Sequence, residues 1–196
     1  MRVLVVYAHP LADSFAAAVH RTVLAALRRG GHEIDDCDLY AEGFEPVLSA
    51  AERRVYNTQN PDLSGVAEYV ARLQAADAVV LCFPTWWYGM PAILKGYFDR
   101  VWTTTVAFDL PPGGGAIIPA LTNIKKFWVV TTLGSPWWLA NLVLWNPVRT
   151  VLLGGLARLC GRGVQRRFLA LYNIDGATHE RCAGFLTRVE RAFTKF

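Results

Sequence analysis

Five apolar segments recur along the chain and are separated by longer segments of mixed polarity. They cover residues 2–7, 32–40, 77–83, 125–133 and 164–174, and the second is the most polar of them. In the first segment the run VLVVY is apolar without alternation, which is typical of a strand covered on both faces of a parallel sheet. The pattern therefore predicts five strands, most of them buried.

The segments between these strands predict helices. The predicted helices cover residues 14–29, 61 or 62–75, 91–102 and 176–196, and a mostly helical stretch at 136–160 is broken near Asn146 and Pro147. Asp13 or Ser14 can cap the first helix. Residues 41–60 are predicted to be irregular, and residues 103–123, which include PPGGG, to form a long loop.

This alternation of strands and helices predicts the fold class. Strands that alternate with helices through short links form a parallel sheet with helices on both faces. We therefore predict an α/β fold with a five-stranded parallel sheet. The 196 residues suit a single domain, and no internal repeat or linker interrupts residues 1–196.

Composition narrows the classes of partner. Hydrophobic residues make up 53% of the chain, charged residues 18%, and the formal net charge is +4. The basic residues are scattered in pairs, such as Arg28 and Arg29, and form no stripe. This pattern argues against nucleic acid and favours anionic small ligands.

The cysteines indicate a reducing compartment. None of the four belongs to a C-x-x-C pair, and none forms a zinc-spaced cluster with histidine. Cys82 and Cys160 lie in apolar runs and are expected in the core. We therefore expect a cytoplasmic protein without a metal site.

An uncharged stretch at residues 127–148 is long enough to span a bilayer. It is interrupted by Gly134, Pro136, Asn141, Asn146 and Pro147. The pattern therefore predicts a buried strand, a turn and an apolar helix, and no transmembrane span.

Three predicted strands end in segments that can bind a ligand. They are AHPLADSF after the first strand, PTWWYG after the third and TTLGSPWW after the fourth. The carboxyl ends of parallel strands share one edge of a sheet, where ligands bind. In the first segment, backbone N–H groups at the helix start, together with Ser14 and His9, can hold a phosphate. A capped helix with an incidental histidine is the alternative.

The other two segments suit a flat ring. Pro84 restrains the turn after the third strand, and Gly89 permits close approach of a ligand. Trp87 or Tyr88 can cover the face of a heteroaromatic ring. The alternative is that the two tryptophans fill the core.

Together these segments resemble the flavodoxin-like NAD(P)H:quinone oxidoreductase family of the DT-diaphorase type, including its small bacterial members. The matching motifs are AHP…SF at residues 8–15, FP-x-x-W-[FY]-G-x-PA-x-LKG-[WY]-[FL]-[DE]-R-V at 83–101 and TT-x-G at 131–134. The second motif is long and specific, and the resemblance covers most of the chain. It implies a flavodoxin-like three-layer sandwich, a bound flavin, either FAD or FMN, and a homodimer. The choice between the two flavins stays open, and we slightly favour FAD.

The resemblance also implies the cofactor-binding residues. Those of the phosphate and ribityl region would be His9, Ser14 and Phe15. Those of the ring would be Pro84, Thr85, Trp86 and Trp87 on one side and Thr131, Thr132 and Gly134 on the other. Tyr88 would face the nicotinamide or the quinone.

The chain departs from the family downstream of TT-x-G. Relatives carry a tyrosine and a histidine there that are credited with stabilising the reduced flavin, whereas residues 135–146 contain neither. The catalytic candidates are therefore Tyr88, Ser135 and the indole N–H of Trp137 or its neighbour Trp138.

The sequence thus predicts a flavin-dependent oxidoreductase that transfers two electrons from NAD(P)H to a quinone or a similar small aromatic acceptor. The alternative is a non-catalytic, flavin-binding ancillary subunit that docks to a membrane transport partner through its Trp-rich segment. Neither the physiological acceptor nor the choice of NADH or NADPH follows from the residues.

Overall fold

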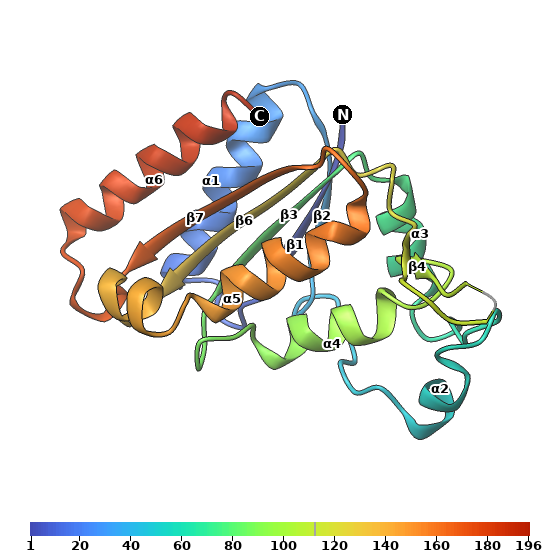
Figure 1. The fold of residues 1–196 in the computed structure, drawn as a ribbon. Helices are drawn as coiled ribbons and strands as arrows, with labels where there is room; N and C mark the ends of the chain where they lie inside the picture. The colour runs from blue at the N-terminus through green and yellow to red at the C-terminus, as the bar shows by residue number, and fades with distance from the viewer. Residues whose placement is uncertain (112) are drawn as a thin grey trace.

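The computed structural model describes residues 1–111 and 113–196. Five parallel strands form its central sheet, in the order β2-β1-β3-β6-β7 (Figure 1). The strands are β1 (Arg2–Tyr7), β2 (Glu33–Asp38), β3 (Ala78–Pro84), β6 (Lys126–Leu133) and β7 (Gln165–Tyr172). The predicted parallel sheet is confirmed, and each strand lies within about two residues of its predicted bounds.

The direction of the chain across the sheet reverses at β1. From β1 the chain passes outward to β2 and then returns to β3 on the other side of β1. All subsequent strands are added beyond β3. The carboxyl ends of β1 and β3 therefore flank the switch point of the sheet, where ligands bind in open α/β folds.

Helices cover both faces of the sheet, as predicted (Figure 1). On one face α1 (Phe15–Arg29) and α6 (His179–Phe193) pack over residues that include Val5, Val80 and Trp128. On the other face α3 (Ala67–Ala75), α4 (Ala92–Val101) and the segment around α5 (Pro147–Arg149) share a second core. Uniformly apolar strands such as β3, which is buried at every position, need such cover on both faces.

Several boundaries differ from the sequence prediction. Residues 41–60 contain a short helix, α2 (Ala50–Val55), which begins with a capping box between Ser49 and Glu52. The next helix, α3, begins at Ala67 rather than at residue 61 or 62, and α6 begins at His179 rather than at residue 176. The predicted loop 103–123 contains a small antiparallel pair, β4 (Phe108–Asp109) with β5 (Ile118–Pro119). Pro112 of that loop lies outside the described residues.

The uncharged stretch forms a strand followed by a broken helix, as predicted. After β6 the chain forms η1 (Leu139–Val143), then α5, η2 (Thr150–Gly155) and η3 (Leu156–Cys160). The break lies at Trp145 and Asn146, which both have positive φ, and the Asn146 side chain caps α5 by accepting from the Arg149 N–H. Within the described part of the chain, no helix combines the length and the apolarity needed to cross a membrane.

Candidate active site

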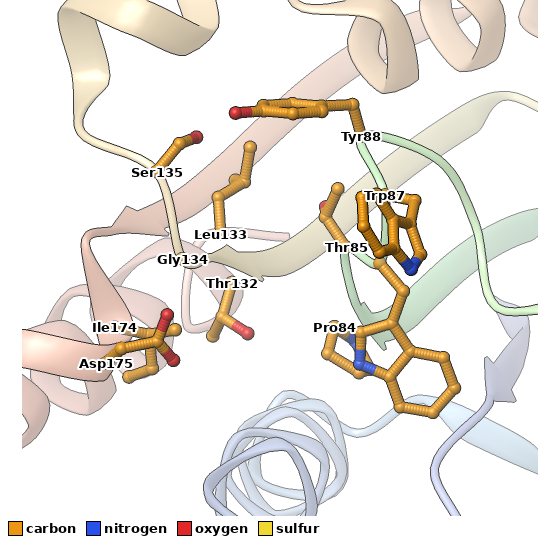
Figure 2. Close-up of a pocket in the computed structure, with 11 residues that line it drawn as sticks. Pro84, Thr85, Trp87, Tyr88, Thr132, Leu133, Gly134, Ser135, Ile174 and Asp175 are labelled. Carbon is orange, nitrogen blue, oxygen red and sulfur yellow. The ribbon is translucent and has the colours of Figure 1, made fainter.

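A cavity of about 520 Å³ lies at the carboxyl ends of β3 and β6 (Figure 2). Its lining comes from the turn after β3, from the end of β6 and from the turn after β7. The lining residues are Pro84, Thr85, Trp86, Trp87, Tyr88, Thr132, Leu133, Gly134, Ser135, Ile174 and Asp175. The cavity therefore lies at the edge of the sheet where a ligand was expected, beside the switch point.

The turn after β3 holds its two central residues in a sterically unfavourable conformation. Trp86 and Gly89 exchange backbone hydrogen bonds of 3.1 and 2.9 Å, and the residues between them, Trp87 and Tyr88, have φ values of 50° and 58°. Two successive positive φ values are those of a type I′ turn, which normally contains asparagine or glycine. Left-handed conformations cost a bulky residue on the order of 1–3 kcal/mol, and they concentrate at ligand sites. As a result, the Trp87 indole projects from the rim and is 98% exposed.

A pair of threonines ties this turn to β6. The Thr85 N–H donates to the carbonyl oxygen of Thr132 at 2.8 Å, and the hydroxyl groups of Thr85 and Thr131 lie 2.9 Å apart. Thr131 is buried, and its hydroxyl is hydrogen-bonded within the protein. Thr131 therefore positions the wall of the cavity, whereas Thr132 lines the cavity itself.

The end of β6 lies against the turn that follows β7. The N–H of Asn173 donates to the carbonyl oxygen of Ser135 at 2.9 Å, and Asn173 has positive φ, which reverses the chain. A Cβ atom added to Gly134 would lie 2.5 Å from Oδ2 of Asp175. A side chain at position 134 would therefore force the Asp175 carboxylate to move, and this close approach brings a carboxylate to the cavity.

The first strand end forms a capped helix beside the cavity. The Ser14 hydroxyl accepts from the Ala17 N–H at 3.1 Å and donates to the carbonyl oxygen of Leu11 at 2.8 Å. Ser14 rather than Asp13 is therefore the N-cap. The Phe15 ring points into the core, where its centroid lies 6.3 Å from that of Phe185, and the His9 ring lies 5.9 Å from the Trp86 ring. None of the three predicted phosphate-region residues lines the cavity, although His9 contacts its Trp86 wall.

The structure thus brings together most of the residues predicted for the ring site. Pro84, Thr85, Trp86, Trp87, Tyr88, Thr132, Gly134 and Ser135 share the cavity. Trp137 instead lines a separate groove along the edge of β7 with Arg167 and Arg188. Leu133, Ile174 and Asp175 also line the cavity but were not predicted from the sequence. Ile174 and Asp175 could have been found from their position directly after the last strand, because all parallel strands of the sheet end at the same edge.

The site offers hydrogen-bond donors rather than a reactive thiol. The Ser135 hydroxyl is buried without a partner in the described residues. Six backbone N–H groups of lining residues find no acceptor within residues 1–111 and 113–196, namely those of Trp87, Tyr88, Gly134, Ser135, Ile174 and Asp175. Cys82 lies just before the cavity in β3, and burial raises its pKa, so its thiol stays protonated. Free donors beside aromatic walls fit a flat heteroaromatic ring with carbonyl edges, as in a flavin.

Comparison with protein families identifies the same fold. The sequence profile described as a flavodoxin-like fold matches residues 1–191. The chain is 32% identical over 190 residues to NAD(P)H dehydrogenase (quinone) 1 of Rattus norvegicus. The alignment covers 82% of this chain and 65% of the rat protein. It spans about half the length of most other curated relatives that it matches.

Two solved structures are similar over the whole chain. The protein Smu.1420 of Streptococcus mutans superimposes with a TM-score of 0.86 and 28% identity, covering 100% of both chains. The NAD(P)H:quinone oxidoreductase of Methanothermobacter marburgensis gives a TM-score of 0.85 and 28% identity, covering 100% of this chain and 95% of that one.

Proposed function

The chain belongs to the flavodoxin-like fold family, and from that premise we propose that it is a flavin-dependent NAD(P)H oxidoreductase that reduces a quinone or a similar small aromatic acceptor. The observation that carries this proposal is the location of the longest motif, because residues 84–88 form one wall of the cavity at the carboxyl edge of the sheet. The names of the rat and Methanothermobacter relatives support the same reaction class.

The flavin, when bound, supplies two-electron chemistry between NAD(P)H and the acceptor. In the proposal, Pro84, Thr85 and Trp86 hold one side of the ring, and Thr132 with Gly134 holds the other. The free N–H groups at the end of β6 stabilise negative charge at the carbonyl edge of the ring, as donors do in an oxyanion hole.

Two lining side chains are proposed to act near the acceptor. The Tyr88 phenol extends across the cavity toward the side on which Ser135 lies (Figure 2). The unpartnered Ser135 hydroxyl is available as a donor to a ligand carbonyl. Trp137 is not carried forward as a donor, because it lines the groove along β7 rather than the cavity.

The phosphate-bearing part of the flavin is proposed to lie at the start of α1. The N–H groups of Phe15 and Ala16 begin that helix, where the helix dipole favours an anion. His9 and Ser14 border the same loop. We slightly favour FAD over FMN. Chromatography of the cofactor released by acid will identify which flavin the purified protein carries.

Flavin loading and turnover test the function directly. The protein is incubated with FAD or FMN, freed of excess cofactor, and assayed for NADH and NADPH oxidation with menadione. We expect a yellow protein with quinone-dependent oxidation. Trp86→Ala should weaken flavin binding, whereas Trp138→Ala, at an exposed position outside the cavity, should not. A protein that stays colourless and inactive contradicts the proposal.

We also propose that the chain acts as a homodimer in the cytoplasm. Leu142, Val143 and Val151 are exposed in the segment after β6, and exposed apolar side chains gather at sites of protein contact. All four cysteines are free thiols, as expected in a reducing compartment. Light scattering after size-exclusion chromatography should give twice the chain mass of 21.8 kDa. The chain mass itself would contradict the dimer.

A further inference from the structure

The cavity contains one charged group. Of the eleven lining residues, Asp175 alone carries a charge at neutral pH, and the other ten are apolar, aromatic, hydroxyl-bearing or glycine. The net charge of the chain is +4, so this negative site is opposite in sign to the molecule as a whole.

The fold presents this carboxylate to the cavity. The hydrogen bond from Asn173 N–H to the Ser135 carbonyl holds the turn after β7 against the end of β6. Gly134 has no side chain, so Oδ2 of Asp175 can lie only 2.5 Å from the point that a Cβ atom of residue 134 would occupy. In Figure 2 the carboxylate of Asp175 lies on the same side of the cavity as Thr132 and Gly134. The turn that carries Asp175 is therefore held against the end of β6 by a backbone hydrogen bond.

No cation neutralises this carboxylate within the described residues. Asp175 takes part in none of their ion pairs. The arginine in the first turns of the following helix, Arg181, donates to the carbonyl oxygen of Tyr172 at 2.9 Å instead. The charge of Asp175 therefore acts on whatever occupies the cavity.

We propose that Asp175 is a specificity-determining residue that makes the cavity select neutral or cationic acceptors and reject anionic ones. This inference rests on the proposed oxidoreductase function. Like charges in a partly enclosed site repel each other more strongly than in water. The phosphates of a flavin are proposed to lie at the start of α1 rather than beside Asp175, so the carboxylate does not face the charged part of the cofactor.

The test compares two acceptors that differ in charge. Steady-state kcat/KM is measured for 1,4-naphthoquinone and for 1,4-naphthoquinone-2-sulfonate, with the wild type and with Asp175→Asn. The ratio of the two values cancels the effect of flavin loading within each variant. We expect Asp175→Asn to raise the relative kcat/KM for the sulfonate by about 3- to 10-fold at low salt, with the neutral quinone little changed. The gain should shrink as salt screens the charge.

Equilibrium binding gives a readout that does not depend on turnover. Quenching of tryptophan fluorescence by each quinone is followed without nicotinamide, because Trp86 and Trp87 line the cavity. The dissociation constant of the sulfonate should fall in Asp175→Asn by a factor similar to the kinetic one. Asp175→Glu keeps the charge and should therefore still discriminate against the sulfonate. If Asp175 had only a structural role, the longer side chain would not be expected to preserve this discrimination.

Asp109→Asn is the matched control. It removes the same charge from an exposed residue of β4, outside the cavity lining, and should leave the ratio unchanged. If both Asn variants shift the ratio equally, only the net charge matters and the inference fails. If the wild type reduces the neutral quinone but Asp175→Asn leaves the ratio unchanged, the inference fails while the proposed function stands. If neither acceptor is reduced, the proposed function fails first.

Discussion

The hydroxyl groups of Thr85 and Thr131 lie 2.9 Å apart, and their hydrogen bond joins the turn after β3 to the adjacent strand β6. Because Thr131 is buried, this bond has little competition from water. It fixes the wall of the cavity from behind, so Thr131, which lies outside the cavity lining, still helps to set the shape of the site.

Thr131→Val tests this positioning role. The substitution keeps the shape of the side chain and removes the hydroxyl that bonds to Thr85 and, at 3.4 Å, to the Thr132 carbonyl oxygen, which should lower the free energy of unfolding by about 1 kcal/mol. It should also weaken flavin binding, measured by quenching of flavin fluorescence, because Thr85 is no longer held. Thr131→Ser retains the hydroxyl and should bind flavin nearly as the wild type does. Equal flavin affinity in the Val and Ser variants would rule out this role.

Gly134→Ala should disrupt the contact between β6 and the turn after β7. The new Cβ atom would clash with Asp175, so either the turn shifts or the carboxylate rotates away. We expect a lower urea midpoint and weaker flavin binding. Gly184→Ala is the control: its Cβ atom would meet nothing within 4 Å, and alanine in α6 should stabilise the helix by about 0.5–1 kcal/mol. Relief of the Gly134→Ala defect by Asp175→Gly would identify the clash as its cause.

Trp87→Asn should separate stability from activity. Asparagine adopts left-handed φ more readily than tryptophan, so the variant should gain up to about 1 kcal/mol in the free energy of unfolding. The same change should raise the KM for the quinone, because the rim of the cavity loses an aromatic wall. Trp145→Asn also relieves a positive φ, of 58°, but at the helix break outside the cavity. It should therefore gain stability without changing KM.

The Glu52–Arg100 pair should make stability depend on pH in the acid range. Nε and one terminal nitrogen of Arg100 lie 2.9 and 2.7 Å from Oε1 of Glu52. Burial alone raises the pKa of Glu52, but hydrogen bonds from Ser49 and Arg100 outweigh it and hold the pKa below its usual value. The stabilisation is therefore complete above the pKa of an unfolded glutamate, about 4.3. It is lost as the pH falls through the lower pKa of the folded state.

Glu52→Gln measures this contribution. It should cost about 3 kcal/mol in urea unfolding at neutral pH, because Arg100 is left buried without its partner. The difference from the wild type should shrink as the pH is lowered. Glu190→Gln removes an exposed pair with Arg29 and should change stability by less than about 1 kcal/mol at any pH. A wild-type stability that does not vary between neutral and acidic pH would contradict the assignment.

The cysteines should differ sharply in reactivity. Cys37, Cys82 and Cys160 are buried, and burial raises the pKa of Cys160 to about 12. Cys182 is half-buried in α6. Reaction with a chromogenic disulfide reagent at neutral pH should therefore modify one thiol quickly in the native protein and all four after denaturation. Cys182→Ser should abolish the fast phase.

Much of the fold follows from local patterns. The bounds of β1 coincide with the predicted strand at residues 2–7, because VLVVY carries no polar residue that would permit exposure on either face. The helix break at Asn146 and Pro147 was also visible, because proline has no backbone N–H to donate and its ring clashes with the preceding turn of a helix. The short helix α2 was missed, because six residues give too little periodicity beside Gly43 and Pro46, although its S-x-x-E capping box was present in the sequence.

The sheet, the layers and the cavity-lining motifs after β3 and β6 were predictable from the sequence, because uninterrupted apolar runs and a specific turn motif are local properties of the chain. Which residues share the cavity depended on the tertiary structure. Asp175 reaches Gly134 because β6 and β7 pair with Leu133 opposite Tyr172, which brings their two ends to the same level. Thr131 and Phe15 point inward for a similar reason, since the packing of neighbouring elements sets which way each side chain faces. Strand register and helix packing are long-range contacts, and no local pattern in the sequence specifies them.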